Sequence, residues 1–169
     1  SEAWIVDIDE YGDRNWHNTY GGKKEDVGKS IDAFSDNSFL LTCETESFGK
    51  GKKDIWLLKI DSNGKIIWEN TLGGKKNDIF GSTLVYSNNS MFISGQRAVK
   101  NTFSLRSILT LNSNKNSSES ANYRSFIARF NGKGEIVWEN DDFEDQKCIT
   151  PYMTTLGKNI LIAGQKSTP

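Results

Sequence analysis

Seven lysines stand in three short glycine-containing segments and are the residues best suited to bind a charged ligand. They are Lys23, Lys24, Lys50, Lys52, Lys53, Lys75 and Lys76. If the fold brought these segments together, the ammonium groups would attract an anionic ligand such as an acidic glycan or a phosphate. The alternative is that they are solvated loop lysines beside Glu25 and Asp26, which keep strand edges soluble. The sequence favours this alternative.

Several aspartates have a spacing that raises the question of a metal site. Asp26 and Asp78 recur at one place in a repeat, but calcium would need more converging oxygen ligands. We therefore expect both carboxylates to tie loops to backbone amides. Asp7, Asp9 and Asp13 superficially suggest a calcium loop, but the expected bidentate glutamate is missing, which favours a hairpin turn. The sequence predicts no metal and no cofactor.

No group of residues has the pattern of a catalytic site. His17 is the single histidine, and Glu69 and Glu139 occupy its repeat positions, so a triad is not indicated. Equivalent positions in successive units would lie too far apart for these two glutamates to act as glycosidase carboxylates. Cys43 and Cys148 have no activating partner visible in the sequence. A disulfide between them and a pair of free thiols remain equally open.

Recurring tryptophans offer either a sugar-binding surface or a packing element. Trp16, Trp68 and Trp138 share one repeat position, and an indole ring stacks well on sugars. Their recurrence at a single strand position instead favours packing between repeat units.

All these residues belong to a repeat with a period near 50 residues. When Trp4 is aligned with Trp56, 12 of 23 positions are identical without a gap, which excludes coincidence. Gly12, Gly64 and Gly134 are equivalent in the three copies, which span about 1–53, 54–123 and 124–169. The second copy holds a polar insertion over 100–122, whose first part, 102–111, could add a short strand. Such a period indicates blades or solenoid units, each of which needs a neighbour to bury its faces.

Each complete unit is predicted to contain four antiparallel strands. The first complete unit has strands over 30–34, 38–45, 54–61 and 65–71, with turns at Asn37 and Gly64. In the third of these, Ile55 and Leu57 face one way, while Trp56, Leu58 and Ile60 face the other. A strand that is apolar on both faces favours a sheet covered on both sides. The predicted fold is all-β, with four-stranded β-propeller blades.

The order of the strands leaves the closure of the fold open. The sequence opens on the third strand of a unit and ends on the second strand of another, so the two ends would complete one mixed blade. Three blades are fewer than the typical 4–8. Three alternatives follow: part of a larger propeller, one half of a dimeric ring, or a three-fold β-trefoil.

Composition excludes some partners but identifies none. The 21 basic and 22 acidic residues nearly balance, which gives no reason to expect nucleic acid or an anionic membrane as partner. No apolar run approaches the length needed to insert into a bilayer. No signal peptide is visible, and the sequence begins without Met, so we expect a processed product or an excerpt of a longer chain.

The repeat resembles a recurrent family of bacterial and archaeal extracellular β-propeller repeats. The likeness rests on DIWLLKIDSNGKIIWENTLGG at 54–74, on Ile93-Ser94-Gly95 and on Ile162-Ala163-Gly164. It covers nearly the whole chain apart from 100–122. The family has no general catalytic residues, and some members belong to surface proteins of the Bacteroidetes type. The resemblance therefore implies an extracellular, periplasmic or cell-surface protein.

Taken together, these observations predict a non-enzymatic binding or scaffold module whose loops on one face bind a protein or a glycan. One alternative is a carbohydrate-binding lectin. Another is a quinoprotein-like propeller enzyme, because the Gly-x-x-x-Trp motif also resembles that of quinone-dependent dehydrogenase propellers.

Overall fold

The protein is an all-β chain in the computed structural model, which describes residues 1–87, 89–99, 122–141 and 148–166. Within these residues every regular element is a strand. None of the described segments forms a helix of the length and apolarity that crossing a membrane requires. The prediction of an all-β fold is confirmed.

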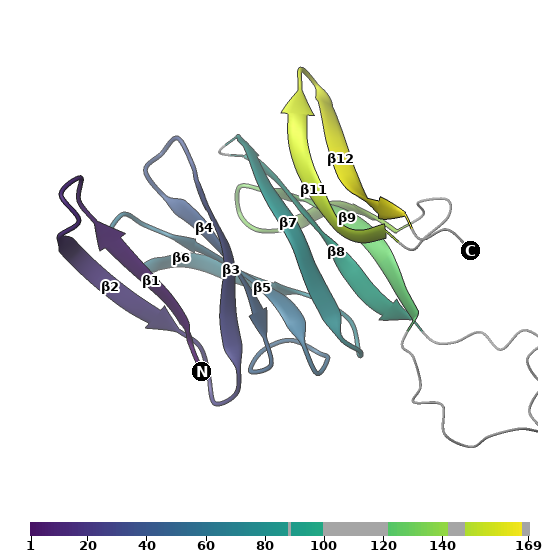
Figure 1. Ribbon diagram of the computed structural model, residues 1–169, viewed down its shortest axis with the longest axis horizontal. Helices are drawn as coiled ribbons and strands as arrows, with labels where there is room; N and C mark the ends of the chain where they lie inside the picture. The colour runs from purple at the N-terminus through teal and green to yellow at the C-terminus, as the bar shows by residue number, and fades with distance from the viewer. Residues whose placement is uncertain (88, 100–121, 142–147, 167–169) are drawn as a thin grey trace, which may run out of the picture.

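The strands form four antiparallel sheets that follow one another along the chain (Figure 1). The first sheet pairs β1 (Ala3–Ile8) with β2 (Arg14–Tyr20). The second sheet has the order β3 (Asp26–Ala33), β4 (Phe39–Thr45), β5 (Asp54–Ile60) and β6 (Ile66–Leu72). The third repeats this order with β7 (Asp78–Ser87), β8 (Ser90–Val99), β9 (Asn122–Asn131) and β10 (Ile136–Asn140). The fourth pairs β11 (Cys148–Leu156) with β12 (Asn159–Lys166).

Three of the hairpins, β1–β2, β5–β6 and β9–β10, use one local mechanism. In the β5–β6 turn, Asp61 Oδ1 accepts hydrogen bonds from the backbone N–H groups of Asn63 and Lys65, both at 2.9 Å. Gly64 follows with a φ of 78°, a conformation that an L side chain disfavours. The β1–β2 and β9–β10 turns repeat this arrangement with Asp9 and Asn131 as acceptors. These side chains explain why the turn residues recur in the sequence.

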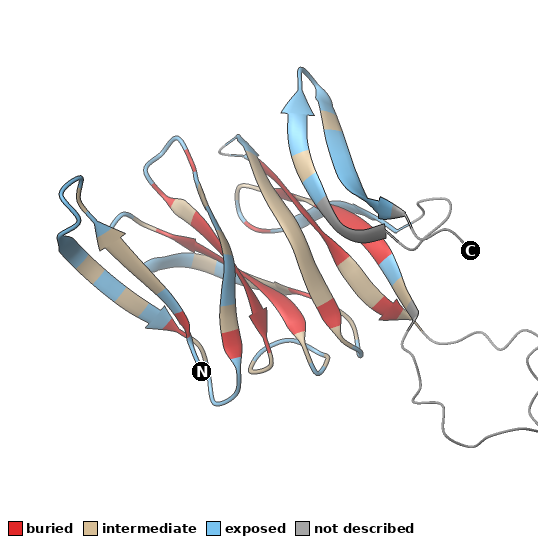
Figure 2. Ribbon diagram, in the orientation of Figure 1, coloured by how far each residue is buried: buried red, intermediate tan, exposed pale blue. Residues whose placement is uncertain are grey.

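The inner strands β4 and β5 of the second sheet are buried on both faces, as the sequence of β5 predicts (Figure 2). Ile55 and Leu57 of β5 lie in a core shared with the third sheet, where they join Met91, Ile93 and Phe126. Trp56, Leu58 and Ile60 lie in a second core with Ala3 and Tyr20 of the first sheet. Alternate side chains of one strand therefore hold together three successive sheets.

Some boundaries differ from the sequence-based expectation. The strand expected over 30–34 begins at Asp26, because its first residues pair in register with the end of β4, Asp26 lying opposite Thr45. Gly28 and Ser30 flank a bulge that interrupts the alternation of side chains there.

The described sheets are open and follow chain order, which does not fit the closed barrel of a β-trefoil. The strand expected within the insertion lies outside the described residues.

Candidate functional site

Three loops from successive sheets meet at one edge of the molecule. They are residues 21–25 between β2 and β3, 46–53 between β4 and β5, and 73–77 between β6 and β7. Glu46 N donates to Glu25 O at 2.8 Å, and Lys24 N donates to Ser47 Oγ at 3.0 Å, which joins the first loop to the second. Asp78 N donates to Lys53 O at 2.7 Å, at the junction of the second loop with β7. We call these three loops the lysine edge, because they carry all seven lysines named above.

Asp26 fixes the first loop to the second sheet. Its side chain is fully buried, accepts hydrogen bonds from Thr45 Oγ1 and Ser47 Oγ, and accepts the N–H of Gly22 at 2.8 Å. Burial alone would raise the pKa of this carboxyl, but the hydrogen bonds from Thr45, Gly22 and Ser47 lower it below its ordinary value. Asp26 is therefore a buried anion that orders the loop.

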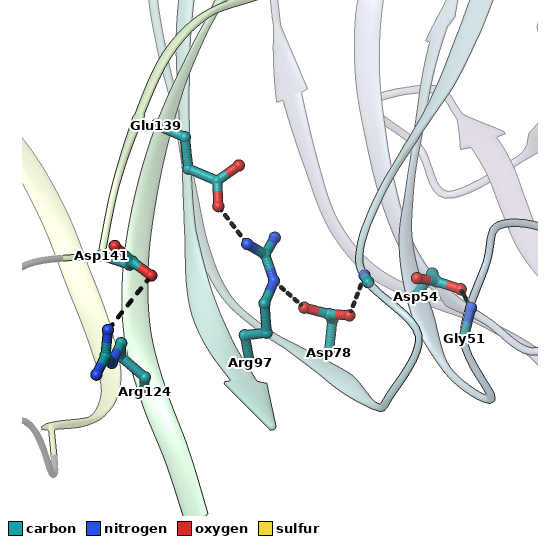
Figure 3. A network of polar contacts seen from close by, with 8 residues as sticks. Gly51, Asp54, Asp78, Arg97, Arg124, Glu139 and Asp141 are labelled. Atoms are coloured by element: carbon teal, nitrogen blue, oxygen red, sulfur yellow. Dashed lines mark hydrogen bonds and ion pairs between the residues drawn. The ribbon is translucent and has the colours of Figure 1, made fainter. Parts of the chain in front are cut away.

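Asp78 fixes the third loop to the third sheet, with Arg97 as its side-chain partner (Figure 3). Its Oδ2 accepts the N–H of Gly74 at 2.8 Å, and its Oδ1 accepts Arg97 Nε at 2.8 Å. Arg97 also donates to Glu139 and lies over the ring of Phe126. Burial would lower the pKa of Arg97, but the ion pairs with Asp78 and Glu139 raise it overall. Arg97 replaces Thr45 at the equivalent place of the next sheet.

Asp54 is the third buried carboxylate beside these loops, and it is poorly satisfied. Its Oδ2 accepts the N–H of Gly51 at 2.8 Å, while its Oδ1 has no hydrogen-bond partner in the described part of the chain. A side chain at Gly73 would collide with this carboxylate, so the glycine permits the close approach. Burial, and then the charge of Asp78, raise the pKa of Asp54.

The lysines themselves point outward from this ordered framework. All are exposed except Lys53, which is half-buried and lies 3.9 Å from both Glu25 and Glu44. Lys76 Nζ donates to the carbonyl of Val99 at 3.0 Å. The other five have no ion-pair partner among the residues that the structure describes: Lys23, Lys24, Lys50, Lys52 and Lys75. The insertion predicted over 100–122 lies outside those residues, apart from Asn122, where β9 begins.

Two of the three recurring tryptophans, Trp16 and Trp68, lie between sheets. Trp68 Nε1 donates to Gly132 O at 3.0 Å, and a Cβ atom added to Gly134 would lie 2.7 Å from the Trp68 ring. Trp16 lies against Gly64 of the β5–β6 turn, where an added Cβ atom would lie 3.0 Å from its ring. Trp138 contacts Phe92 at 5.9 Å between ring centroids and keeps 39% of its surface exposed. Trp56 is buried, whereas Trp4, its repeat equivalent, is 59% exposed.

Several of the groups considered for catalysis or for a metal site are engaged elsewhere. Glu69 accepts the indole N–H of Trp56 at 3.1 Å, and Glu139 accepts Arg97. Cys43 is a free thiol, buried in the second sheet, and burial raises its pKa to about 12. Asp9 caps a hairpin. Among the described residues, no three His, Cys, Asp or Glu side chains are grouped to hold a metal ion.

Two residues that shape this site escaped the sequence analysis, namely Asp54 and Arg97. Asp54 aligns with Glu2, so the repeat comparison does not mark it as special. Arg97 aligns with Thr45. This change from threonine to arginine, beside the recurring aspartate at positions 26 and 78, is the signal that could have revealed the ion pair between Asp78 and Arg97.

Comparison with known proteins adds nothing to this geometry: no family model matches the chain, and no curated protein matches it.

Proposed function

We propose that this protein is a non-enzymatic binding module, built from successive β-propeller blades, that holds an anionic ligand on its lysine edge. The observation that carries the proposal is a set of five exposed lysines on three neighbouring loops, none of which has an ion-pair partner among the described residues. Ammonium groups held on adjacent ordered loops create a positive local potential.

The acidic groups near these loops support this assignment. Asp26, Asp54 and Asp78 are buried, and Asp26 and Asp78 use their oxygens to accept hydrogen bonds within the protein. The ordered loops would present their lysines with little loss of backbone entropy on binding. The acidic side chain that would compete with a ligand is Glu25, which already lies 3.9 Å from Lys53.

Two further features support a binding role in a propeller. The two complete sheets have four strands each in sequential order and are packed face to face, as propeller blades are. The carboxylates and the thiol considered for catalysis are hydrogen-bonded or deeply buried. The resemblance to extracellular propeller repeats supports a location outside the cell, in the periplasm or at the cell surface.

The test is a binding titration with a sulfated oligosaccharide, a neutral oligosaccharide and inorganic phosphate. We expect the sulfated ligand to bind, with affinity that falls as salt rises from about 50 to about 200 mM because screening weakens the attraction. Lys23→Gln/Lys24→Gln should weaken binding about fivefold or more, given about 1 kcal/mol for a close unit-charge pair in water.

The matched control removes two lysines from the opposite edge of the sheets. Lys65 and Lys133 are exposed and lie in the β5–β6 and β9–β10 turns. Lys65→Gln/Lys133→Gln changes the net charge equally and should leave the affinity unchanged. Equal losses in the two variants would refute a localised site, and salt-independent binding of the neutral oligosaccharide would favour the lectin alternative.

A further inference from the structure

Two strands of the described structure have a free edge where their repeat equivalents are paired. In the second sheet β4 pairs with β5, and in the third sheet β8 pairs with β9. The repeat makes β12 equivalent to β4 and β8, and β1 equivalent to β5 and β9. Among the described strands, β12 pairs only with β11, and β1 pairs only with β2. The two free edges are therefore the two halves of a pairing that occurs twice inside the chain.

Exposed apolar side chains mark these two edges. Trp4 on β1 is 59% exposed, whereas its equivalents Trp56 and Phe126 are 3% and 1% exposed. On β12, Ile162 is 41% exposed, whereas Leu41 and Ile93 are 3% and 0% exposed. Large apolar side chains that are buried in two copies of a repeat and exposed in the third indicate a missing neighbour.

The internal registers specify how the free edges would pair. Cys43 lies opposite Trp56, and Gly95 lies opposite Phe126, so a small residue faces a large aromatic ring in both complete sheets. The equivalent pair is Gly164 with Trp4, which keeps this combination. The next inward-facing pair, Leu41 with Leu58, corresponds to Ile162 with Val6. Both of these inward-facing positions therefore find a compatible residue.

The tryptophan contacts between sheets give a second, independent indication. Trp16 lies against Gly64, and Trp68 lies against Gly134, each in the turn of the following sheet. Trp138, the third member, remains 39% exposed. Gly12, which is equivalent to Gly64 and Gly134, has the same positive φ, but a Cβ atom there would meet nothing within 4 Å. Trp138 and Gly12 therefore belong to the same repeated contact, and within the described residues each lacks the partner that its equivalents have.

We propose that a second copy of this chain supplies the missing neighbour at both edges. β12 of each copy pairs antiparallel with β1 of the other copy, with Ile162 opposite Val6, and Trp138 packs on Gly12 of that same copy. The two-stranded sheets lie at opposite ends of the row in Figure 1, so they do not meet within one chain. Two copies related by a two-fold axis satisfy both ends at once and close the assembly.

The closed assembly has a reasonable size for its architecture. Each chain contributes two complete sheets and two half sheets, so two chains form six four-stranded sheets. Six lies within the range of about 4–8 blades of known propellers. Closure also removes every exposed edge at these two strands, which protects them from uncontrolled strand addition.

The first test is the mass in solution by sedimentation. We expect wild-type protein to sediment as a discrete species of twice the 19.0-kDa chain. Ile162→Lys should raise the dimer dissociation constant at least about 100-fold, because it places a charge in a buried apolar pair. Ile67→Lys is the control, since Ile67 lies on the outer strand β6 and is 55% exposed. It should remain dimeric.

A monomeric wild type, an open-ended polymer, or a dimer that survives Ile162→Lys would overturn the proposal. Circular dichroism of the variant checks that it keeps its strands. If Ile162→Lys fails to fold, Trp4→Lys on β1 supplies the same test. Trp4 is already exposed within one chain, so this change should leave the fold of the single chain intact.

Cysteine cross-linking tests the register itself. Val6→Cys/Ile162→Cys, with Cys148 replaced by serine, should form a covalent dimer on mild oxidation, because directly paired residues lie within disulfide range of about 4.4–6.8 Å between Cα atoms. Cys43 stays unchanged, since its thiol is buried with a raised pKa. Val6→Cys/Ala163→Cys is shifted by one residue and should not cross-link. Equal cross-linking in both variants, or none in the first, would refute the register. Neither result depends on ligand binding at the lysine edge.

Discussion

At the residue scale, two buried aspartates beside the same loops are held in opposite electrostatic conditions. Asp26 accepts hydrogen bonds from two hydroxyls and one backbone N–H, which lower its pKa in spite of its burial. Asp54 accepts the N–H of Gly51 but leaves one oxygen unpaired, and its burial raises its pKa. The two carboxylates should therefore change stability with pH in opposite directions.

Asp26→Asn should lower the free energy of unfolding at pH 7 by about 2 kcal/mol, the usual value for hydrogen bonds to a buried charged group. The folded pKa of Asp26 lies below its ordinary unfolded value of about 3.9. Its stabilisation is therefore complete above that value and disappears as the pH falls through the folded pKa. Urea unfolding should show a difference between variant and wild type that shrinks on acidification to pH 3. A difference that grows on acidification would contradict this assignment.

Asp54→Asn should show the opposite pH dependence. The folded pKa of Asp54 is raised, so wild-type stability falls as the pH rises from the ordinary unfolded value of about 3.9 through the folded pKa. Asparagine has no such titration. The stability of the variant relative to wild type should therefore increase between pH 3 and pH 7, as measured by urea midpoints. A relative decrease over this interval would show that the Asp54 anion is better stabilised than its contacts indicate.

Gly134 should be more sensitive to substitution than its conformation alone explains. Gly134 and Gly157 both have positive φ, but a Cβ atom at Gly134 would press on the Trp68 ring, whereas one at Gly157 would meet nothing within 4 Å. Gly134→Ala should cost at least about 1 kcal/mol more than Gly157→Ala, because it adds overpacking to the shared backbone strain. Thermal or urea unfolding measures this difference. Equal costs would mean that Trp68 moves away freely.

At the element scale, strand β5 serves two cores at once. Leu57 lies in the core between the second and third sheets, and Leu58 lies in the core between the first and second sheets. Both side chains are completely buried. The strand therefore contributes to stability through both of its faces.

Leu57→Ala and Leu58→Ala should each lower the free energy of unfolding by about 2–5 kcal/mol, the range for buried leucines. Ile67→Ala, on the exposed part of β6, should cost less than about 1 kcal/mol. Chemical denaturation of the three variants provides the comparison. A mild effect of Leu58→Ala alone would mean that the first sheet does not cover β5 as described.

Much of this arrangement can be predicted from the sequence, because its repeated residues are determined locally. Asp61 and Gly64 specify a hairpin by hydrogen bonding and positive φ, and the alternation in β5 specifies two buried faces. The ion pair between Asp78 and Arg97 was not predicted, because it joins the start of β7 to the far end of β8. The unpaired oxygen of Asp54 was not predicted either, since it depends on how two loops approach each other.

At the scale of the whole molecule, the sheets form a row with different properties at its two edges. One edge gathers the lysine-bearing loops, which buried aspartates order. The other edge carries the hairpin turns, where glycines receive the tryptophans of the preceding sheet. This division separates the residues that stack the sheets from the residues proposed to bind a ligand. Changes to the lysines should therefore affect binding with little effect on stability.

The stacking of one sheet on the next is the claim on which the lysine edge and the proposed dimer both depend. Proton NMR tests it directly at Gly134, because one Hα atom points toward the Trp68 ring along the bond whose Cβ atom would lie 2.7 Å from that ring. We expect this Hα resonance to lie well upfield, with a nuclear Overhauser contact to the indole, and to return to an ordinary shift in Trp68→Leu. An ordinary shift and no indole contact in the wild-type protein would contradict the stacked arrangement.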